Sequence, residues 1–259
     1  MSTTATALQE CLKELNLPTA RASVAAISQQ ATQESYSYEQ FLLELLRLEC
    51  EGRQQRRIER LLRESRLPLD KSLDAFDLAR LPAKVRQQVT ALREGAFVAR
   101  QENVLAFGKP GSGKTHLLCG LCQELVRQGR RALYATCALL VQELLSAKRD
   151  LRLPQMLKRL ARYDVLLIDD LGYVRQDREE MEVLFTLLAE RYERGSVLIT
   201  SNLPFSQWEA IFKDPMTTAA AIDRLVHHSV ILELNLPSYR MEQAQAKRRQ
   251  SSKARDGTT

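Results

Sequence analysis

The eight residues "GKPGSGKT", Gly108 to Thr115, come directly after the apolar run "NVLAF" at residues 103–107. They fit the pattern G-x-x-x-x-G-K-[ST], in which backbone N–H groups of a glycine-rich loop surround phosphate oxygens. The preceding run is typical of a strand, and the following "THLLCGLCQELVRQG" has the spacing of a helix that ends at Gly129. A strand before and a helix after are the context that this pattern requires. The stretch therefore predicts a nucleotide-phosphate site rather than a chance glycine-rich turn.

Each residue type in this loop has an expected role. The glycines permit the unusual backbone angles that aim successive N–H groups at phosphates, and the helix beginning near Gly113 adds the positive end of its dipole. Lys114 is expected to reach the outer phosphates, and the hydroxyl of Thr115 to bind Mg²⁺. The expected nucleotide contacts are the loop and the residue after it: Gly108, Lys109, Pro110, Gly111, Ser112, Gly113, Lys114, Thr115 and His116.

Polar residues end two further apolar runs, "DVLLIDD" at 164–170 and "SVLITSN" at 196–202. Continuous apolar runs of this length are typical of parallel strands that are buried on both faces. Asp169 is expected to hold Mg²⁺ through water, and Asp170 to orient or deprotonate the attacking water. The amide of Asn202 is expected to sense the γ-phosphate or help place that water. The alternatives are that the acids cap the next turn, or that "SN" before "LPF" marks only a turn.

Strand-like and helical segments alternate through most of the chain. Five strand-like runs, at 103–108, 131–137, 164–170, 196–202 and 229–234, are separated by helical patterns. Such alternation predicts an α/β fold whose five-stranded parallel sheet carries helices on both faces. Residues 7–66 have helical spacing and no strand-like run, so a small all-α domain is expected first, with a capping box at Ser37 and Gln40. The predicted limits are 1–66 for this domain, 67–245 for the nucleotide-binding domain and 246–259 for a polar, basic, disordered tail.

Composition places few limits on function. The 259 residues are 44% apolar and carry a net charge of +6 with a pI of about 9.1, which is either ordinary or slightly favours a polyanionic partner. Cys119 and Cys122 form "CGLC" inside a predicted helix, which favours a reduced structural pair in a cytosolic protein over a redox or metal pair. The histidines at 116, 227 and 228 have no metal-ligand spacing. Neither a signal peptide nor a bilayer-spanning run is found, so a soluble, cytoplasmic protein with no membrane partner is expected.

Several longer stretches resemble one known family. They are "SYEQFLLELLRLE", "LARYDVLLIDDLGY", "LLAERYERGSVLITSNLPFSQW", "IDRLVHHSVILEL" and "SYRMEQ", and the resemblance covers roughly residues 12–245. In these residues the chain is similar to the AAA+ ATPases of the helicase-loader, DnaC-like clade. It is most similar to the IstB-like group, the transposition helper ATPases of insertion sequences. The resemblance implies an AAA+ P-loop NTPase fold, with ATP and Mg²⁺ as cofactors and slow, DNA-stimulated hydrolysis of ATP to ADP and phosphate.

The resemblance also implies roles for two arginines. Arg224, in "DRL", matches the arginine finger that reaches the nucleotide of the neighbouring subunit, where its charge stabilises phosphoryl transfer; the alternative is a surface salt bridge. Arg240, in "SYR", is similar in position to a second sensor arginine. With Lys114, Asp170 and Asn202, Arg224 completes the expected catalytic set. One departure is that Asp170 stands where many AAA+ proteins carry glutamate. Its side chain is one methylene shorter, so hydrolysis is expected to be slow or coupled to a partner.

Two groups of basic residues are candidates for DNA contact. The first lies between the second and third strands, where initiator-type AAA+ proteins carry an extra helix that contacts DNA. The second lies in the N-terminal domain, where glutamates interleave with arginines and offer i,i+4 pairs. The first group would bind phosphates without reading bases, and the second would contact DNA or a partner; the alternative for each is a solvated helix face. The candidates are Lys148, Arg149, Arg152, Lys158 and Arg159 in the first group and Arg53, Arg56, Arg57 and Arg60 in the second.

The function that these features favour is an ATP-dependent helper protein of an insertion sequence. ATP would join identical chains head to tail into a ring, spiral or filament. This assembly would bind double-stranded DNA without sequence preference, bend or select the target site, and recruit or stimulate the transposase. A replicative helicase loader shares the ATPase motifs and is the first alternative. The second is a nucleotide-gated scaffold with negligible hydrolysis, because the side chain of Asp170 is short.

Overall fold

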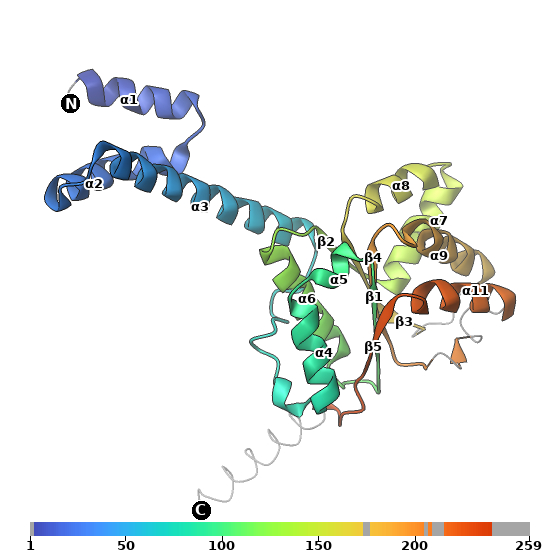
Figure 1. Ribbon diagram of the computed structural model, residues 1–259. Helices are drawn as coiled ribbons and strands as arrows, with labels where there is room; N and C mark the ends of the chain where they lie inside the picture. The colour runs from blue at the N-terminus through green and yellow to red at the C-terminus, as the bar shows by residue number, and fades with distance from the viewer. Residues whose placement is uncertain (1–2, 173–176, 205–206, 209–214, 240–259) are drawn as a thin grey trace, which may run out of the picture. The chain divides into compact units, whose positions relative to one another are not determined.

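The computed structural model describes residues 3–172, 177–204, 207–208 and 215–239 (Figure 1). The chain divides into two compact units, Met1–Arg60 and Leu61–Thr259. The predicted tail, 246–259, lies outside the described residues, and the domain limits at 66 and 245 stay predictions. Within the described part of the chain, no helix is both long enough and apolar enough to cross a membrane.

The first unit is helical, as its sequence pattern predicts. It contains α1 (Thr3–Glu14), α2 (Pro18–Glu34) and most of α3 (Tyr38–Glu64). Its small apolar core is formed by Leu12, Ala20, Val24 and Leu45. Each helix turns one narrow apolar face to this core, which is why the sequence shows helical spacing without any continuous apolar run.

Polar side chains determine where two of these helices begin. Ser37 and Gln40 form the predicted capping box of α3: the N–H of Ser37 donates to Oε1 of Gln40 at 2.9 Å, and the N–H of Gln40 donates to Oγ of Ser37 at 3.2 Å. At the start of α2, the N–H groups of Thr19 and Ala20 donate to the carboxylate of Glu49, at 2.8 and 3.0 Å. Glu49, which is 2% exposed, therefore caps α2 from α3.

The second unit contains a five-stranded parallel sheet, which confirms the predicted fold. The strands lie in the order β2-β3-β4-β1-β5, so the phosphate loop follows an interior strand with β4 and β5 on either side. In this register Val104 of β1 lies opposite Leu198 of β4 and Val230 of β5. The strands are β1 (Asn103–Phe107), β2 (Ala132–Thr136), β3 (Val165–Leu171), β4 (Ser196–Ser201) and β5 (Ser229–Glu233).

Helices cover both faces of the sheet (Figure 1), because successive strand residues point to opposite sides. On one face, α4 and α6 pack against a cluster that includes Val104 and Leu198. On the other, α7, α8, α9 and α11 pack against a cluster that includes Leu105 and Ile199. The described helices of this unit are η1 (Leu78–Arg80), α4 (Ala83–Arg93), α5 (Ala96–Ala99), α6 (Lys114–Arg127), α7 (Cys137–Arg149), α8 (Leu153–Leu160), α9 (Arg178–Arg191) and α11 (Pro215–Val226).

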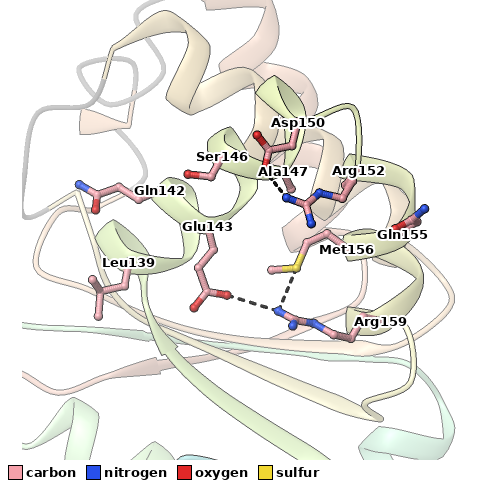
Figure 2. Close-up of a pocket in the computed structure, with 10 residues that line it drawn as sticks. All are labelled: Leu139, Gln142, Glu143, Ser146, Ala147, Asp150, Arg152, Gln155, Met156 and Arg159. Atoms are coloured by element: carbon pink, nitrogen blue, oxygen red, sulfur yellow. Dashed lines mark hydrogen bonds and ion pairs between the residues drawn. The ribbon is translucent and has the colours of Figure 1, made fainter.

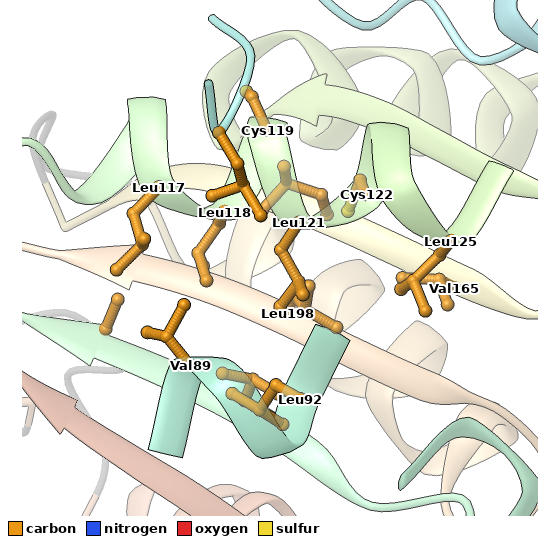
Figure 3. Packing of buried hydrophobic residues seen from close by; sticks show 14 of the residues in the cluster. Val89, Leu92, Leu117, Leu118, Cys119, Leu121, Cys122, Leu125, Val165 and Leu198 are labelled. Atoms are coloured by element: carbon orange, nitrogen blue, oxygen red, sulfur yellow. The ribbon is translucent and has the colours of Figure 1, made fainter. Parts of the chain in front are cut away.

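The helix that follows the phosphate loop, α6, is buried against the sheet (Figure 3). Leu118, Leu121 and Leu125 are at most 1% exposed, and Cys119 and Cys122 are free thiols with no exposed surface. Burial raises the pKa of the Cys119 thiol to about 12, so this thiol stays protonated and unreactive. The observations support a structural pair, and the buried helix gives the loop at its N-terminus a rigid base.

Candidate nucleotide-binding site

The phosphate loop joins the end of β1 to the start of α6, and its backbone requires glycine at several positions, among them Gly111 and Gly113. Gly111 and Gly113 have φ angles of +80° and +97°, in the left-handed region that other residues rarely adopt. A Cβ atom at Gly113 would also lie 2.8 Å from Cε2 of Phe76, and one at Gly111 would collide with Oγ of Ser238. Gly113 is the N-cap of α6, so the N–H groups of the loop and the positive end of the helix dipole meet at one place.

Lys114, the first residue of α6, links this loop to the end of β4. Lys114 is only 5% exposed. Its Nζ donates to the carbonyl oxygens of Gly108 at 2.8 Å and Lys109 at 3.1 Å, and to Oδ1 of Asn202 at 2.7 Å. The structure therefore brings together the lysine and the amide that the sequence assigned separately to the phosphates, although 88 positions separate them in the chain.

Asp169, near the end of β3, is held by hydroxyl groups from three other elements. Its Oδ1 accepts hydrogen bonds from Oγ1 of Thr115 at 2.8 Å and Oγ1 of Thr200 at 2.6 Å, and its Oδ2 accepts one from Oη of Tyr134 at 3.0 Å. Burial and then the charge of Asp169 raise the pKa of Tyr134, so its phenol remains a donor. Tyr134 and Thr200 were not predicted; the only signal for them is a hydroxyl inside each of the strand-like runs "LYAT" and "LITS".

The neighbouring acid, Asp170, has a different environment. The ladder between β3 and β4 shifts register between Ile168 and Leu171, and Asp170 has a φ of +60° at this irregularity. Its backbone N–H donates to Oγ1 of Thr200 at 2.8 Å. Such a bulge turns a side chain out of the regular alternation. It leaves Asp170 exposed while Asp169 is buried, so the two adjacent carboxylates are presented for different tasks.

A cavity of about 510 Å³ opens beside these groups. Its lining includes loop residues and His116, together with Asp170 and Asn202. It also includes Asp70, Lys71 and Tyr239, for which no role was predicted. The cavity therefore joins the phosphate loop to the two expected water-positioning groups.

Aromatic residues form a second, smaller hollow on the same side of the loop. Phe76 packs edge-on against His116 with ring centroids 5.3 Å apart, and the guanidinium of Arg80 lies 5.0 Å from the ring centre of Tyr239. Aromatic and apolar surfaces of this kind suit the base of a nucleotide. Phe76 and Arg80 were not predicted, because "DAFDLAR" lies in the stretch between the two predicted domains.

The residues present fit a nucleoside triphosphate with Mg²⁺. The cradle of the loop excludes a Cβ at Gly111 and Gly113, and a buried cation, Lys114, lies at its centre. Mg²⁺ prefers hard oxygen ligands. The hydroxyl of Thr115 and the carboxylate of Asp169 offer two such oxygens, 2.8 Å apart.

The predicted finger, Arg224 on α11, lies away from this cavity within its own chain. Its guanidinium carbon is 4.7 Å from the ring centre of Phe185 on α9. Its Nη1 is buried and has no hydrogen-bond partner among the described residues. Arg224 is not among the residues that line this cavity, and its role as a finger stays a prediction. The predicted second sensor, Arg240, lies outside the described residues.

The first group of predicted DNA contacts lies on and between α7 and α8, where a cavity of about 630 Å³ is found (Figure 2). Acidic residues line it too: Arg152 pairs with Asp150, and Arg159 lies 3.4 Å from Glu143. Lys148 forms an ion pair with Glu182 of α9 at 3.1 Å. Arg149 and Lys158 are exposed, and no ion pair is found for either within the described part of the chain.

The second group lies on α3, and two of its members have structural contacts. Arg53 and Arg56 each donate to Oε1 of Glu49 at 3.1 Å, and Arg56 also donates to Oγ1 of Thr19 at 2.9 Å. These arginines therefore neutralise the carboxylate that caps α2. Arg57 and Arg60 are exposed. A role of either group in binding DNA stays a prediction.

The fold and the site together define a P-loop NTPase of the AAA+ class. The solved structure of the DnaC helicase loader matches this chain with a TM-score of 0.53 at 17% sequence identity; the match covers 64% of this chain and 97% of that one. At this identity the likeness concerns the fold.

The chain belongs to the family of IstB-like ATP binding proteins, whose model matches residues 10–247. The "Putative insertion sequence ATP-binding protein y4iQ/y4nD/y4sD" of Sinorhizobium fredii (strain NBRC 101917 / NGR234) is 41% identical over 250 residues, which are 96% of this chain and 84% of that protein. The "Insertion sequence IS21 putative ATP-binding protein" of Pseudomonas aeruginosa is 38% identical over 236 residues, 91% of this chain and 89% of that protein. The resemblance stated from the sequence is thereby confirmed.

Proposed function

We propose that this protein is an ATP-dependent helper of transposition, which assembles on duplex DNA in the cytoplasm and recruits or stimulates the transposase of its insertion sequence. The observation that carries the proposal is the convergence of Lys114, Asn202, Thr115 and Asp169 at one edge of the sheet. The membership of the family agrees with it, since relatives are described as insertion sequence ATP-binding proteins.

The site is suited to hydrolysis of ATP to ADP and phosphate. Mg²⁺, when bound by Thr115 and Asp169, supplies charge that stabilises the transferring phosphoryl group. Lys114 contacts the outer phosphates, Asn202 orients the attacking water, and Asp170 accepts a proton from it. Because Asp170 carries a short side chain on an exposed bulge, we expect slow turnover of ATP. We also expect DNA to accelerate this turnover.

Arg224 supports assembly through the nucleotide. In its own chain the guanidinium lies on Phe185, and its buried Nη1 has no hydrogen-bond partner among the described residues, so this donor would have to be uncovered before it could reach another molecule. A cation that completes the site of the next subunit makes a head-to-tail contact, which generates rings, spirals or filaments of identical chains. ATP thus joins subunits in this proposal, and hydrolysis releases them.

The DNA contact is assigned to α7 and α8 and to the arginines of α3. The ion pairs of Arg152 and Arg159 are exposed, and exposed pairs contribute only about 0–1 kcal/mol each. Phosphates can therefore replace Asp150 and Glu143 as partners at little cost. Binding through phosphates alone is independent of sequence and weakens steeply with salt.

The test combines ATP and duplex DNA with electron microscopy. With a slowly hydrolysed ATP analogue and DNA, we expect ordered arrays with one nucleotide between adjacent subunits; monomers under every condition would contradict the proposal. The fold of the DnaC helicase loader supports one alternative, a helicase loader. Co-purification separates the two: a transposase supports the proposal, and a replicative helicase supports the alternative. A chain that assembles with ATP but releases no phosphate would instead be a nucleotide-gated scaffold.

A further inference from the structure

A cluster of metal-ligating side chains lies outside the nucleotide site. Glu193 follows α9, and His227 and His228 form the turn between α11 and β5. Their ligand atoms all lie within 4.8 Å of one another, and all three residues are exposed. Sequence spacing gave no sign of this cluster, because the carboxylate comes from a distant part of the chain.

A neighbouring phenol orients one of the histidines. Oη of Tyr192 lies 3.1 Å from Nδ1 of His227, and the two ring centroids are 6.2 Å apart. The ring of His228 stands edge-on to that of His227 at 4.1 Å. Histidines that bind metals are regularly held by a hydrogen bond at the nitrogen that does not bind. The contact of Tyr192 engages Nδ1 of His227, so an ion bound by this histidine would use Nε2.

We propose that Glu193, His227 and His228 bind a divalent transition-metal ion, with Zn²⁺ as the expected occupant. Two imidazoles and one carboxylate are the donors that Zn²⁺ and its neighbours in the first transition series accept, whereas Mg²⁺ and Ca²⁺ prefer oxygen alone. Three protein ligands leave a fourth position open to water or to a donor from another molecule.

This site is separate from the proposed Mg²⁺ site. The carbonyl oxygen of His228 accepts the N–H of Asn103 at 2.7 Å, and Asn103 is the first residue of β1. The phosphate loop follows the other end of the same strand. At a rise of about 3.3 Å per residue, the two sites are on the order of 15 Å apart, at opposite ends of this strand.

The ion would join the ends of two helices that already touch. His227 directly follows α11, three positions after Arg224, and Arg224 and His227 contact Phe185 and Tyr192 at the α9 side. An ion shared by Glu193 and His227 adds a cross-link between these elements. It therefore stabilises the segment that carries the proposed finger without contacting the nucleotide.

The experiment uses the full chain without a histidine tag, freed of metal, and with the exposed thiols of Cys11 and Cys50 alkylated. Titration with Zn²⁺ against a chelating indicator should give one equivalent bound, and Co²⁺ should give a visible absorption band. His228→Asn and Glu193→Gln should each weaken binding about tenfold or more. The matched control is His116→Asn, which removes the third histidine of the chain and should leave the affinity unchanged.

Two outcomes overturn the proposal. One is equal Zn²⁺ affinity in the wild type and in a variant lacking all three ligands; the other is a loss of Zn²⁺ affinity in His116→Asn as large as that in the ligand variants. A second measurement guards against misfolding. In the absence of metal, the melting temperatures of the ligand variants should match the wild type because the residues are exposed, and added Zn²⁺ should raise that of the wild type alone. Lys114→Ala should still bind Zn²⁺, so failure of the nucleotide site and failure of this site are distinguishable.

Discussion

Oγ1 of Thr200 donates to Oδ1 of Asp169 at 2.6 Å and accepts the backbone N–H of Asp170 at 2.8 Å. One hydroxyl on β4 therefore positions two adjacent acids of β3: the carboxylate assigned to Mg²⁺ and the backbone of the residue assigned to the attacking water. Because β3 and β4 are neighbouring parallel strands, any shift of their register would move both groups together.

Thr200→Val tests this positioning role. Valine has a similar shape but no hydroxyl, so Asp169 loses a donor and the N–H of Asp170 loses its acceptor. We expect nucleotide binding to change little and hydrolysis to fall about tenfold, since a hydrogen bond to a charged group contributes about 1.5–3 kcal/mol. Phosphate release at varied Mg²⁺ measures the effect. Thr200→Ser should restore most of the rate, and equal rates for valine and wild type would remove the role.

Asp170→Asn separates binding from hydrolysis. The amide keeps the size of the side chain but accepts no proton, and general-base catalysis contributes about 10²–10⁴-fold. We expect wild-type affinity for ATP, a rate at least about a hundredfold lower, and subunits that stay assembled after ATP is added. Analytical ultracentrifugation with a phosphate assay records both effects. Asp74→Asn, an exposed carboxylate outside the cavity, is the control; unchanged turnover in the Asp170 variant would contradict its assignment.

Mixing variants tests whether Arg224 acts on a neighbouring subunit. Arg224→Ala should bind ATP normally and lose about 10³-fold in hydrolysis, while Lys114→Ala should fail to bind ATP. In a mixture, the intact loop of one variant can meet the intact arginine of the other, so activity should partly return. In a second mixture, the double variant Lys114→Ala with Arg224→Ala replaces the single Lys114 variant. It should give no recovery, because neither chain then carries the arginine. If neither mixture regains activity although both assemble, Arg224 acts only within its own chain, through Phe185.

The interior strands β1, β3 and β4 and the phosphate loop could be predicted because burial on both faces forces continuous apolar runs, and the loop tolerates few residue types. All five runs became strands, with boundaries within about two residues. The capping box of Ser37 and Gln40 was also local enough to read. The strand order β2-β3-β4-β1-β5 was not predicted, because it depends on packing between segments far apart in the sequence.

The site was predicted where its chemistry is concentrated in motifs and missed where it depends on tertiary contacts. Lys114, Thr115 and Asp169 were chosen from short patterns, and the structure joins them. Thr200 acts through a hydrogen bond across two strands, and Phe76 reaches the loop from a segment without regular pattern. Neither contact has a signature in sequence spacing.

The first unit should lose stability in acid because of Glu49. Burial alone raises the pKa of this carboxyl, but the N–H groups of Ala20 and Thr19 with Arg53 and Arg56 outweigh it, and the net pKa is lowered. Because the pKa of Glu49 is lower in the folded chain, its contribution to stability is complete above its pKa in the unfolded chain, about 4.3. That contribution is lost as the pH falls through its pKa in the folded chain.

Glu49→Gln should abolish this acid dependence and destabilise α2 by about 2 kcal/mol at neutral pH, because a neutral amide replaces a charged acceptor. Hydrogen exchange of the α2 amides, recorded as a function of pH in the full chain, measures both the acid dependence and the destabilisation. Glu44→Gln, whose exposed pair with Arg47 is 3.2 Å long, is the control and should change exchange little. Identical profiles for wild type and Glu49→Gln would show that the cap contributes nothing.

Arg191 should be required for stability of the second unit. It ends α9, is 4% exposed, and donates to the carbonyl oxygens of Leu160, Tyr163, Asp164 and Ser196 at 3.0–3.2 Å. Burial lowers the pKa of its guanidinium to about 10, which leaves it charged at neutral pH.

Arg191→Met keeps the length of the side chain but leaves those carbonyls without this donor, so the free energy of unfolding should fall by about 3 kcal/mol or more. Arg191→Lys should lose less, because an ammonium can still donate three hydrogen bonds. Arg194→Met removes only an exposed pair with Glu190 and should change unfolding by less than about 1 kcal/mol. Urea unfolding of the three variants measures the differences. Equal midpoints for Arg191→Met and Arg194→Met would mean that packing, not the guanidinium, joins the end of α9 to the sheet.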